Sequence, residues 1–158
     1  SIGFLKGDLK EKTEQYFVSF YDNLEKLIGK ADTKLLRENG LITETIINFI
    51  RGNTFGSQDV FGNPIGHFCV LDECQNLTVS ELKTYISRMS IDSKLIILGD
   101  EDQQDIKLKD GELNALQWAF EYLTDLPGVA HFRFEEDDIV REPILIDIMK
   151  RFKRFEKF

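Results

Sequence analysis

The sequence predicts an α/β domain with a mainly parallel sheet. Two continuous apolar runs, Phe68–Leu71 and Leu95–Leu98, have the composition of strands buried on both faces, as in a parallel sheet covered by helices. Between them, residues 77–89 show helical spacing and contain Thr78-Val79-Ser80-Glu81, which fits a helix-capping box. Strand, helix and strand in this order form a βαβ unit, and a helix in each later step between strands favours parallel pairing.

The elements before this unit follow from their own patterns. Apolar residues recur every three or four positions from Leu9 to Ile28, which predicts an amphipathic helix that ends at Gly29. We expect a shorter helix over residues 32–38. Residues 44–50 are rich in β-branched and aromatic side chains and favour a strand. Residues 53–66 are rich in glycine and have no period, so they favour a loop, with room for a small hairpin.

After the unit, a helix is expected from Asp110 or Gly111 through Leu123, closed by Pro127-Gly128. Residues 129–134 resemble a strand. Residues 143–158 place apolar side chains at intervals of three and four among five lysines and arginines, which predicts a last helix with a basic outer face. That face is either simply solvated or a contact for RNA or single-stranded DNA.

Length and charge limit the class of protein. The 158 residues suffice for a single domain, and the net charge of −8 argues against nucleic-acid binding by bulk phosphate neutralisation, although a local basic patch stays open. The two cysteines, Cys69 and Cys74, lack zinc or disulfide-framework spacing and are expected to be buried thiols in a reducing compartment. We find no membrane span and no signal peptide, so we expect a cytoplasmic protein.

Acidic and amide residues follow both central strands. Asp72 and Glu73 come directly after the first, and Asp100 and Gln103 follow the second. In open α/β sheets, ligands bind outside the carboxyl ends of the strands. An apolar run followed by Asp-Glu has the form of a Walker B segment, in which one carboxylate reaches Mg²⁺ and the other orients or deprotonates water. The alternative is an ordinary strand end with solvated acids.

Several segments, in order, resemble those of PhoH-like ATPases, relatives of superfamily 1 helicases. Asp72-Glu73-Cys74-Gln75-Asn76 is similar to their DEAQN box, and Gly99-Asp100-Glu101-Asp102-Gln103-Gln104-Asp105 is similar to their GDxxQxD box. Further counterparts are Ile2–Asp8 with Glu11-Lys12, Asp22-Asn23-Leu24, Arg51–Thr54 and Asp138–Pro143. Cys74, Asp102, Glu142 and the long 53–66 loop, which resembles an insertion, depart from the family pattern.

The resemblance implies a three-layer RecA-like P-loop NTPase core that binds and hydrolyses ATP with Mg²⁺. It makes Asp72 the Mg²⁺ ligand and Glu73 the catalytic base, with Gln103 as the γ-phosphate sensor. The other implied site residues are nucleotide-binding Gln75 and Asp100, the arginine finger Arg141, and Arg51, for which a structural salt bridge is the alternative. Glu142 can hold Arg141 in a local ion pair, which weakens the finger assignment.

The sequence contains no GxxxxGK[ST] loop, whose backbone amides and lysine hold phosphates. In the family this loop precedes the segment that resembles Ile2–Asp8. We therefore expect residues 1–158 to be a single RecA-like domain without its N-terminal Walker A strand and helix, and to show no ATPase activity alone. One hypothesis is a homo-oligomeric ATPase that acts on RNA or another nucleic acid. The other is a non-catalytic nucleic-acid-binding or protein-binding assembly module that has lost the P-loop.

Overall fold

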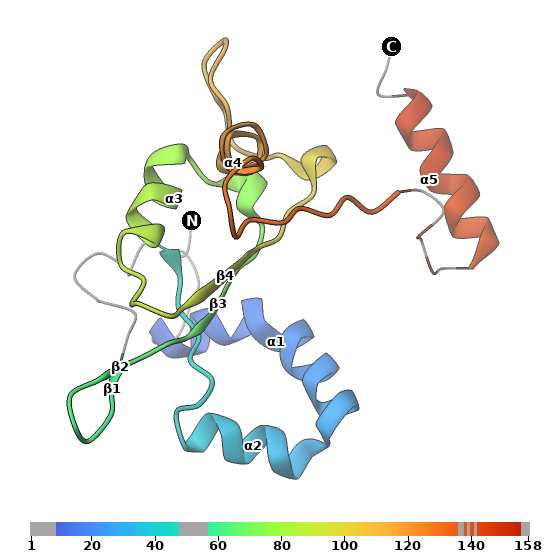
Figure 1. Cartoon of the computed structure of the whole chain (residues 1–158). Helices are drawn as coiled ribbons and strands as arrows, with labels where there is room; N and C mark the ends of the chain where they lie inside the picture. The colour runs from blue at the N-terminus through green and yellow to red at the C-terminus, as the bar shows by residue number, and fades with distance from the viewer. Residues whose placement is uncertain (1–8, 48–56, 136–137, 139, 141, 156–158) are drawn as a thin grey trace. The chain divides into compact units, whose positions relative to one another are not determined.

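The computed structural model describes residues 9–47, 57–135, 138, 140 and 142–155 and divides the chain into two compact units, residues 1–117 and 118–158 (Figure 1). The helices and strands, in chain order, are α1 (Leu9–Ile28), α2 (Lys30–Glu38), β1 (Ser57–Gln58), β2 (Pro64–Ile65), β3 (Phe68–Leu71), α3 (Val79–Ile86), β4 (Lys94–Ile97), α4 (Ala115–Leu123) and α5 (Pro143–Phe155). The predicted α/β class is confirmed. No described helix is long and apolar enough to cross a membrane.

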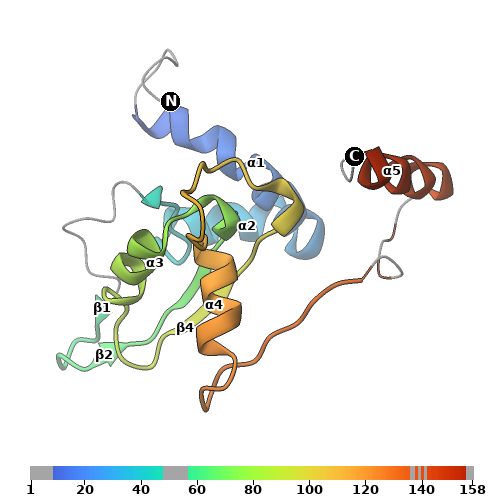
Figure 2. The same cartoon turned by 90° about the horizontal axis from the view of Figure 1, so that it is seen from above.

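Strands β3 and β4 form the predicted βαβ unit with α3 between them (Figures 1 and 2). The strands are parallel, with Phe68 opposite Lys94 and Leu71 opposite Ile97. Thr78 starts α3 as predicted, because its hydroxyl accepts a hydrogen bond from the Glu81 amide at 3.2 Å while the Glu81 carboxylate accepts from the Thr78 amide at 2.8 Å. This reciprocal cap satisfies two backbone donors at the start of α3 and so fixes where that helix begins.

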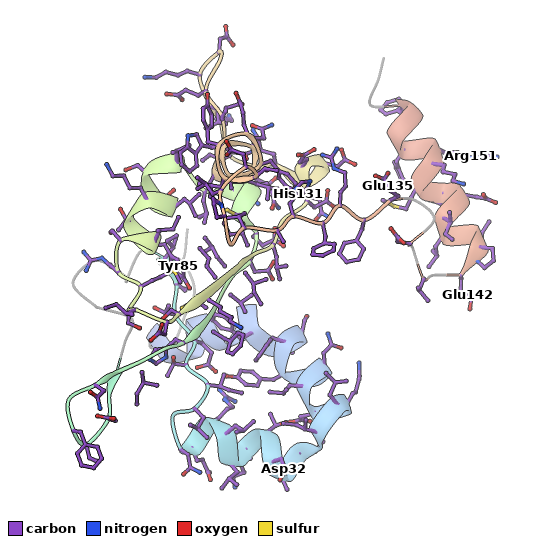
Figure 3. All side chains as sticks on the ribbon, viewed as in Figure 1. Asp32, Tyr85, His131, Glu135, Glu142 and Arg151 are labelled. Atoms are coloured by element: carbon purple, nitrogen blue, oxygen red, sulfur yellow. The ribbon has the colours of Figure 1, made fainter. Side chains whose placement is uncertain are left out.

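The core of the βαβ unit lies along α3. Leu82 and Tyr85 of α3 are buried, as are Cys69 and Leu71 of β3 and Leu116 in the first turn of α4. Burial raises the pKa of Tyr85 to about 12, and the neighbouring Cys69 adds to that rise. Figure 3 labels Tyr85 near the end of α3. The alternation of side chains along β3 brings Cys69 and Leu71 into the core.

The prediction that both strands are buried on both faces is wrong for the described structure. Phe68 and Val70 alternate with the buried pair in β3 and are 76% and 52% exposed. Strand β4 alternates in the same way between exposed and half-buried residues. An apolar run fits a doubly covered sheet, but in the described part of the chain the second face of this two-stranded sheet is exposed.

Two further strand predictions were not confirmed. Residues 44–47 contain no strand, and residues 48–50 of that prediction lie outside the described part of the chain. Glu44 instead accepts hydrogen bonds from Tyr21 of α1 and from Arg37 of α2, the latter at 2.9 Å. Residues 129–134 are irregular. β-Branched and aromatic residues form a strand only where a neighbouring strand is available. Among the described residues no strand pairs with either segment, and His131 instead contacts Phe120 of α4 edge-to-face.

The remaining predicted elements are present. Helices α1, α2 and α5 match their predicted positions closely, and the small hairpin within residues 53–66 is the antiparallel pair β1 and β2. Gly29, with φ of 88°, separates α1 from α2, a conformation that suits glycine. Figure 3 labels Asp32 on α2, and Glu142 and Arg151 at and along α5. The labelled His131 and Glu135 lie in the irregular segment before α5.

The two thiols should react slowly in the folded protein. Both are buried, and burial raises the pKa of Cys74 from 9.0 to about 11 and raises that of Cys69. At pH 8 this shift lowers the thiolate fraction of Cys74 about 100-fold, and the thiolate is the reactive form. In a Cys69→Ser variant, alkylation of Cys74 by iodoacetamide should therefore be at least about 100-fold slower in buffer than in urea. Equal rates in both solvents would show that Cys74 is accessible.

Candidate functional site

The acidic residues that follow β3 lie on a tight turn. Glu73 adopts a left-handed backbone conformation, with φ of 55° and ψ of 36°, and its amide donates to Oδ1 of Asp72 at 2.9 Å. A short 3-10 turn, η3 (Cys74–Asn76), follows at once. The Cys74 amide donates to the Leu98 carbonyl at 2.9 Å, so the turn is attached to the end of β4. A non-glycine residue in this conformation costs on the order of 1 kcal/mol or more and is often found at functional sites.

Gln75 joins the two strand ends. Its side chain is fully buried. Its amide nitrogen donates to Oε2 of Glu73 at 2.6 Å and, more weakly, to the Gln103 carbonyl at 3.4 Å. Its amide oxygen accepts from the Asp100 backbone at 3.0 Å. One side chain therefore fixes the carboxylate after β3 and the backbone after β4 at the same time.

Gly99 leaves the space that Gln75 occupies. A Cβ atom at position 99 would lie 2.6 Å from Oε1 of Gln75 and 2.9 Å from Cδ2 of Leu116. Real Cβ atoms essentially never approach other atoms so closely. Glycine is required here because the buried carboxamide and the core pack directly against the backbone, and not because of an unusual φ angle.

The segment after Gly99 folds around the Asp100 carboxylate. Asp100 caps the 3-10 turn η4 (Glu101–Gln103) by accepting from the Asp102 amide at 3.0 Å, and it also accepts from Nε2 of Gln103 at 2.7 Å. Asn76 holds the far end of the loop, because its Oδ1 accepts from the Asp105 amide at 2.6 Å. Loop 100–105 is thus fastened to the turn after β3 at both of its ends.

The structure brings most of the predicted site residues together. Asp72, Glu73, Gln75, Asp100 and Gln103 all lie at the ends of β3 and β4, linked by the hydrogen bonds above. The Asp72, Glu73, Asp100 and Gln103 side chains are exposed, whereas the Gln75 carboxamide already has protein partners. The two remaining predictions, Arg51 and Arg141, lie outside the described residues.

Sequence reasoning missed Asn114 as part of this region and assigned no role to Gln104. Asn114 is fully buried, and its Nδ2 donates to Oε1 of Gln104 at 2.6 Å. The helix starting at Asp110 or Gly111 was also placed too early, because α4 begins at Ala115 after Asn114. The Asn114-x-x-Gln117 spacing, which forms a reciprocal cap, was the signal that could have located this start.

The chemistry of this edge suits a divalent cation with its own oxygen ligands. The side chains of Asp72, Glu73 and Asp100 supply carboxylate oxygens, which are hard ligands. Within the described residues, however, no three His, Cys, Asp or Glu side chains form a group that could hold a metal ion. A cation bound here would therefore need further oxygens from a ligand or from water, which is the usual situation for Mg²⁺.

Comparison with known proteins decides the family. The model of the family described as PhoH-like protein matches residues 1–153. This chain belongs to the PhoH-like family. The resemblance of its Asp-Glu-Cys-Gln-Asn and Gly-Asp segments to the boxes of that family is therefore confirmed at the level of the family.

Relatives of this PhoH-like chain come from bacteria of several genera. The PhoH-like protein of Bacillus subtilis (strain 168) is 33% identical over 98% of this chain and 45% of its own length. The PhoH-like protein of Synechocystis sp. is 32% identical over 98% of the chain and 44% of its own length. Protein PhoH of Escherichia coli (strain K12) is 31% identical over 90% of the chain and 38% of its own length. The chain thus spans less than half the length of these relatives. No solved structure matches it significantly.

Proposed function

We propose that these residues form the metal-binding and water-activating side of a Mg²⁺-dependent ATPase with a three-layer RecA-like core, in which residues 1–158 are one N-terminally incomplete domain. The observation that carries the proposal is the bridge made by Gln75. It holds the Glu73 carboxylate and the Asp100 backbone in one arrangement at the carboxyl ends of two parallel strands. Ligands of open α/β sheets bind at this edge.

The first pair of residues has separate tasks in this proposal. Asp72 is exposed at the strand end and would bind Mg²⁺, either directly or through water, together with phosphate oxygens. Glu73 accepts from Gln75 through Oε2, and no described donor contacts its Oε1. That second oxygen can accept a proton from a water molecule that attacks the γ-phosphate. The bound metal would neutralise the negative charge of the phosphates.

The second strand end would detect the γ-phosphate. Gln103 donates one hydrogen of its Nε2 to Asp100 at 2.7 Å. A carboxamide nitrogen carries two hydrogens, so the other can bond to a phosphate oxygen. The Asp100 carboxylate thereby sets the direction of the Gln103 side chain, and this orientation of Gln103 is the role that we assign to Asp100.

The phosphate cradle must come from elsewhere, because residues 1–158 contain no GxxxxGK[ST] segment. We assign it to other residues of the whole protein. Arg141 is our candidate for the arginine finger, a role worth roughly 10³ to 10⁵ in rate where it operates, and Arg51 for a contact with nucleotide or nucleic acid.

We propose that the whole protein binds RNA or single-stranded DNA and assembles as a homo-oligomer. The support for nucleic acid is α5, which exposes the cationic side chains of Lys150 and Arg151 and the aromatic ring of Phe152. Cations that follow the backbone and aromatic rings that stack on bases are the usual means of binding single strands. A non-catalytic assembly module built on the same residues is the second candidate.

ATP hydrolysis by the whole protein at varied Mg²⁺ concentration tests the proposal. We expect activity that disappears on chelation of Mg²⁺, and we expect Asp72→Asn to raise the Mg²⁺ concentration for half-maximal activity by about ten-fold or more, because a neutral amide is a weaker ligand than a carboxylate. Asp125→Asn, which changes an exposed aspartate beyond α4, is the matched control. Absence of Mg²⁺-dependent hydrolysis by the unmutated whole protein would instead support the non-catalytic module.

A further inference from the structure

Asn114, just before α4, uses its side chain for two different purposes. Its Oδ1 accepts from the Gln117 amide at 2.8 Å, which caps α4, while its Nδ2 donates to Oε1 of Gln104 at 2.6 Å. The side chain is fully buried, although Gln104 itself is exposed. A helix cap needs only the oxygen, so the contact of Nδ2 with Gln104 is a separate feature.

Gln104 directly follows the residue to which we assign phosphate detection. Its own Nε2 donates to the Ile106 carbonyl at 3.1 Å, so both ends of its carboxamide are bonded. From the other side of the loop, Asn76 accepts from the Asp105 amide at 2.6 Å and donates weakly to the Gln103 carbonyl at 3.4 Å. Asn76 therefore holds the backbone of residues 103 and 105, and Asn114 holds the Gln104 side chain between them.

The backbone at Asn114 is bonded to the βαβ unit. Asn114 forms an isolated antiparallel bridge with Thr78, and the neighbouring Ala115 amide donates to the Leu77 carbonyl at 2.8 Å. The residues just before α3 and α4 are thus joined to each other. A hydrogen bond from such an anchored and buried side chain restrains a loop more than one from a mobile surface group.

We propose that Asn114 is a positioning residue for the phosphate-sensing loop: through Gln104 it sets the backbone that carries Gln103. The effect on turnover rests on the proposed function, whereas the effect on the loop does not. Asn114 does not touch the proposed reacting groups. Its role depends on an amide donor, which explains why the cap is asparagine when serine or aspartate would cap α4 equally well.

Two variants separate positioning from helix capping. Asn114→Ser keeps an oxygen for the cap but cannot reach Gln104, and Gln104→Met removes the acceptor at an exposed position together with the bond from Gln104 to the Ile106 carbonyl. Both should accelerate hydrogen exchange of the Asp105 amide by roughly three- to ten-fold, the equivalent of one hydrogen bond, because the loop then opens more often. Asn39→Ser, the same change at an exposed residue after α2, is the control. Unchanged exchange in both variants would overturn the proposal.

Steady-state kinetics of the whole protein provide the second measurement. We expect each single variant to lower kcat by roughly three- to ten-fold at unchanged KM for ATP, and the double variant to be no slower than the slower single one. A purely structural role predicts an unchanged kcat, and independent roles predict that the two losses multiply; either result overturns the proposal. If the unmutated protein hydrolyses no ATP, the proposed function fails, and the exchange measurement alone decides the role of Asn114. If Asn114→Ser does not fold, Gln104→Met tests the same bond when compared with Gln104→Glu, which keeps the acceptor for Asn114 and loses only the donor to Ile106.

Discussion

Replacement of Glu73 by glutamine in the whole protein should lower kcat for ATP hydrolysis by about 10² to 10⁴-fold, the usual contribution of a general base. Glutamine has the same shape as glutamate and keeps an oxygen that can accept the hydrogen bond from Gln75. It cannot take a proton from water. Steady-state phosphate release at saturating ATP and Mg²⁺ measures the loss.

The binding of ATP should change little in the same variant. Glu73 has no proposed contact with the nucleotide in its ground state, so KM should stay within about three-fold. Glu121→Gln, at an exposed position of α4, serves as the control and should leave both parameters unchanged. A Glu73→Gln variant with the kcat of the unmutated protein would remove Glu73 from the chemical step and leave the carboxylate a structural partner of Gln75.

Gly99→Ala should destabilise the fold by roughly 1–3 kcal/mol, the usual range for overpacking of a well-packed region. The new Cβ would lie 2.6 Å from Oε1 of Gln75 and 2.9 Å from Cδ2 of Leu116. Because both partners are buried, neither can move aside without the loss of a hydrogen bond or of core packing. Urea unfolding of the 158-residue chain, followed by circular dichroism, measures this difference in the free energy of unfolding.

A second variant shows whether the Gln75 carboxamide causes that loss. Gln75→Ala removes the side chain that the new methyl group meets first, although it also leaves the Asp100 amide without this acceptor. Gly99→Ala should therefore cost less in the Gln75→Ala background than in the natural chain, by about 1 kcal/mol. Equal costs in both backgrounds would assign the clash to Leu116 and to the backbone nitrogen of residue 75, which lies 3.3 Å from the new Cβ.

The βαβ unit was predictable because its signals are local. The capping box at Thr78 and the two apolar runs depend on neighbouring residues only, and they located α3 to within a few residues and identified β3 and β4. Residues 44–47 and 129–134 show the limit of such signals. Their composition favours strands, but strand formation needs a partner, and nothing in a single segment reveals whether one is present.

The site was predictable as a set of strand ends but not as a network. Asp72 and Asp100 were expected at one edge because parallel strands end on the same side of a sheet. The full burial of Gln75, and the need for glycine at position 99, depend on contacts between segments that are distant from each other in the sequence. The role of Asn114 in the loop was missed because its bond to Gln104, only 10 residues away, joins a helix cap to a loop, which no local pattern reveals.

The most direct test of the proposed site is the identity of the nucleotide that the Glu73→Gln whole protein retains. The variant and the unmutated protein are each incubated with ATP and Mg²⁺ and freed of unbound nucleotide, and the bound nucleotide is then identified by anion-exchange chromatography. We predict that the variant holds ATP whereas the unmutated protein holds ADP. Recovery of ADP from both proteins in equal proportion would contradict the assignment of water activation to the end of β3.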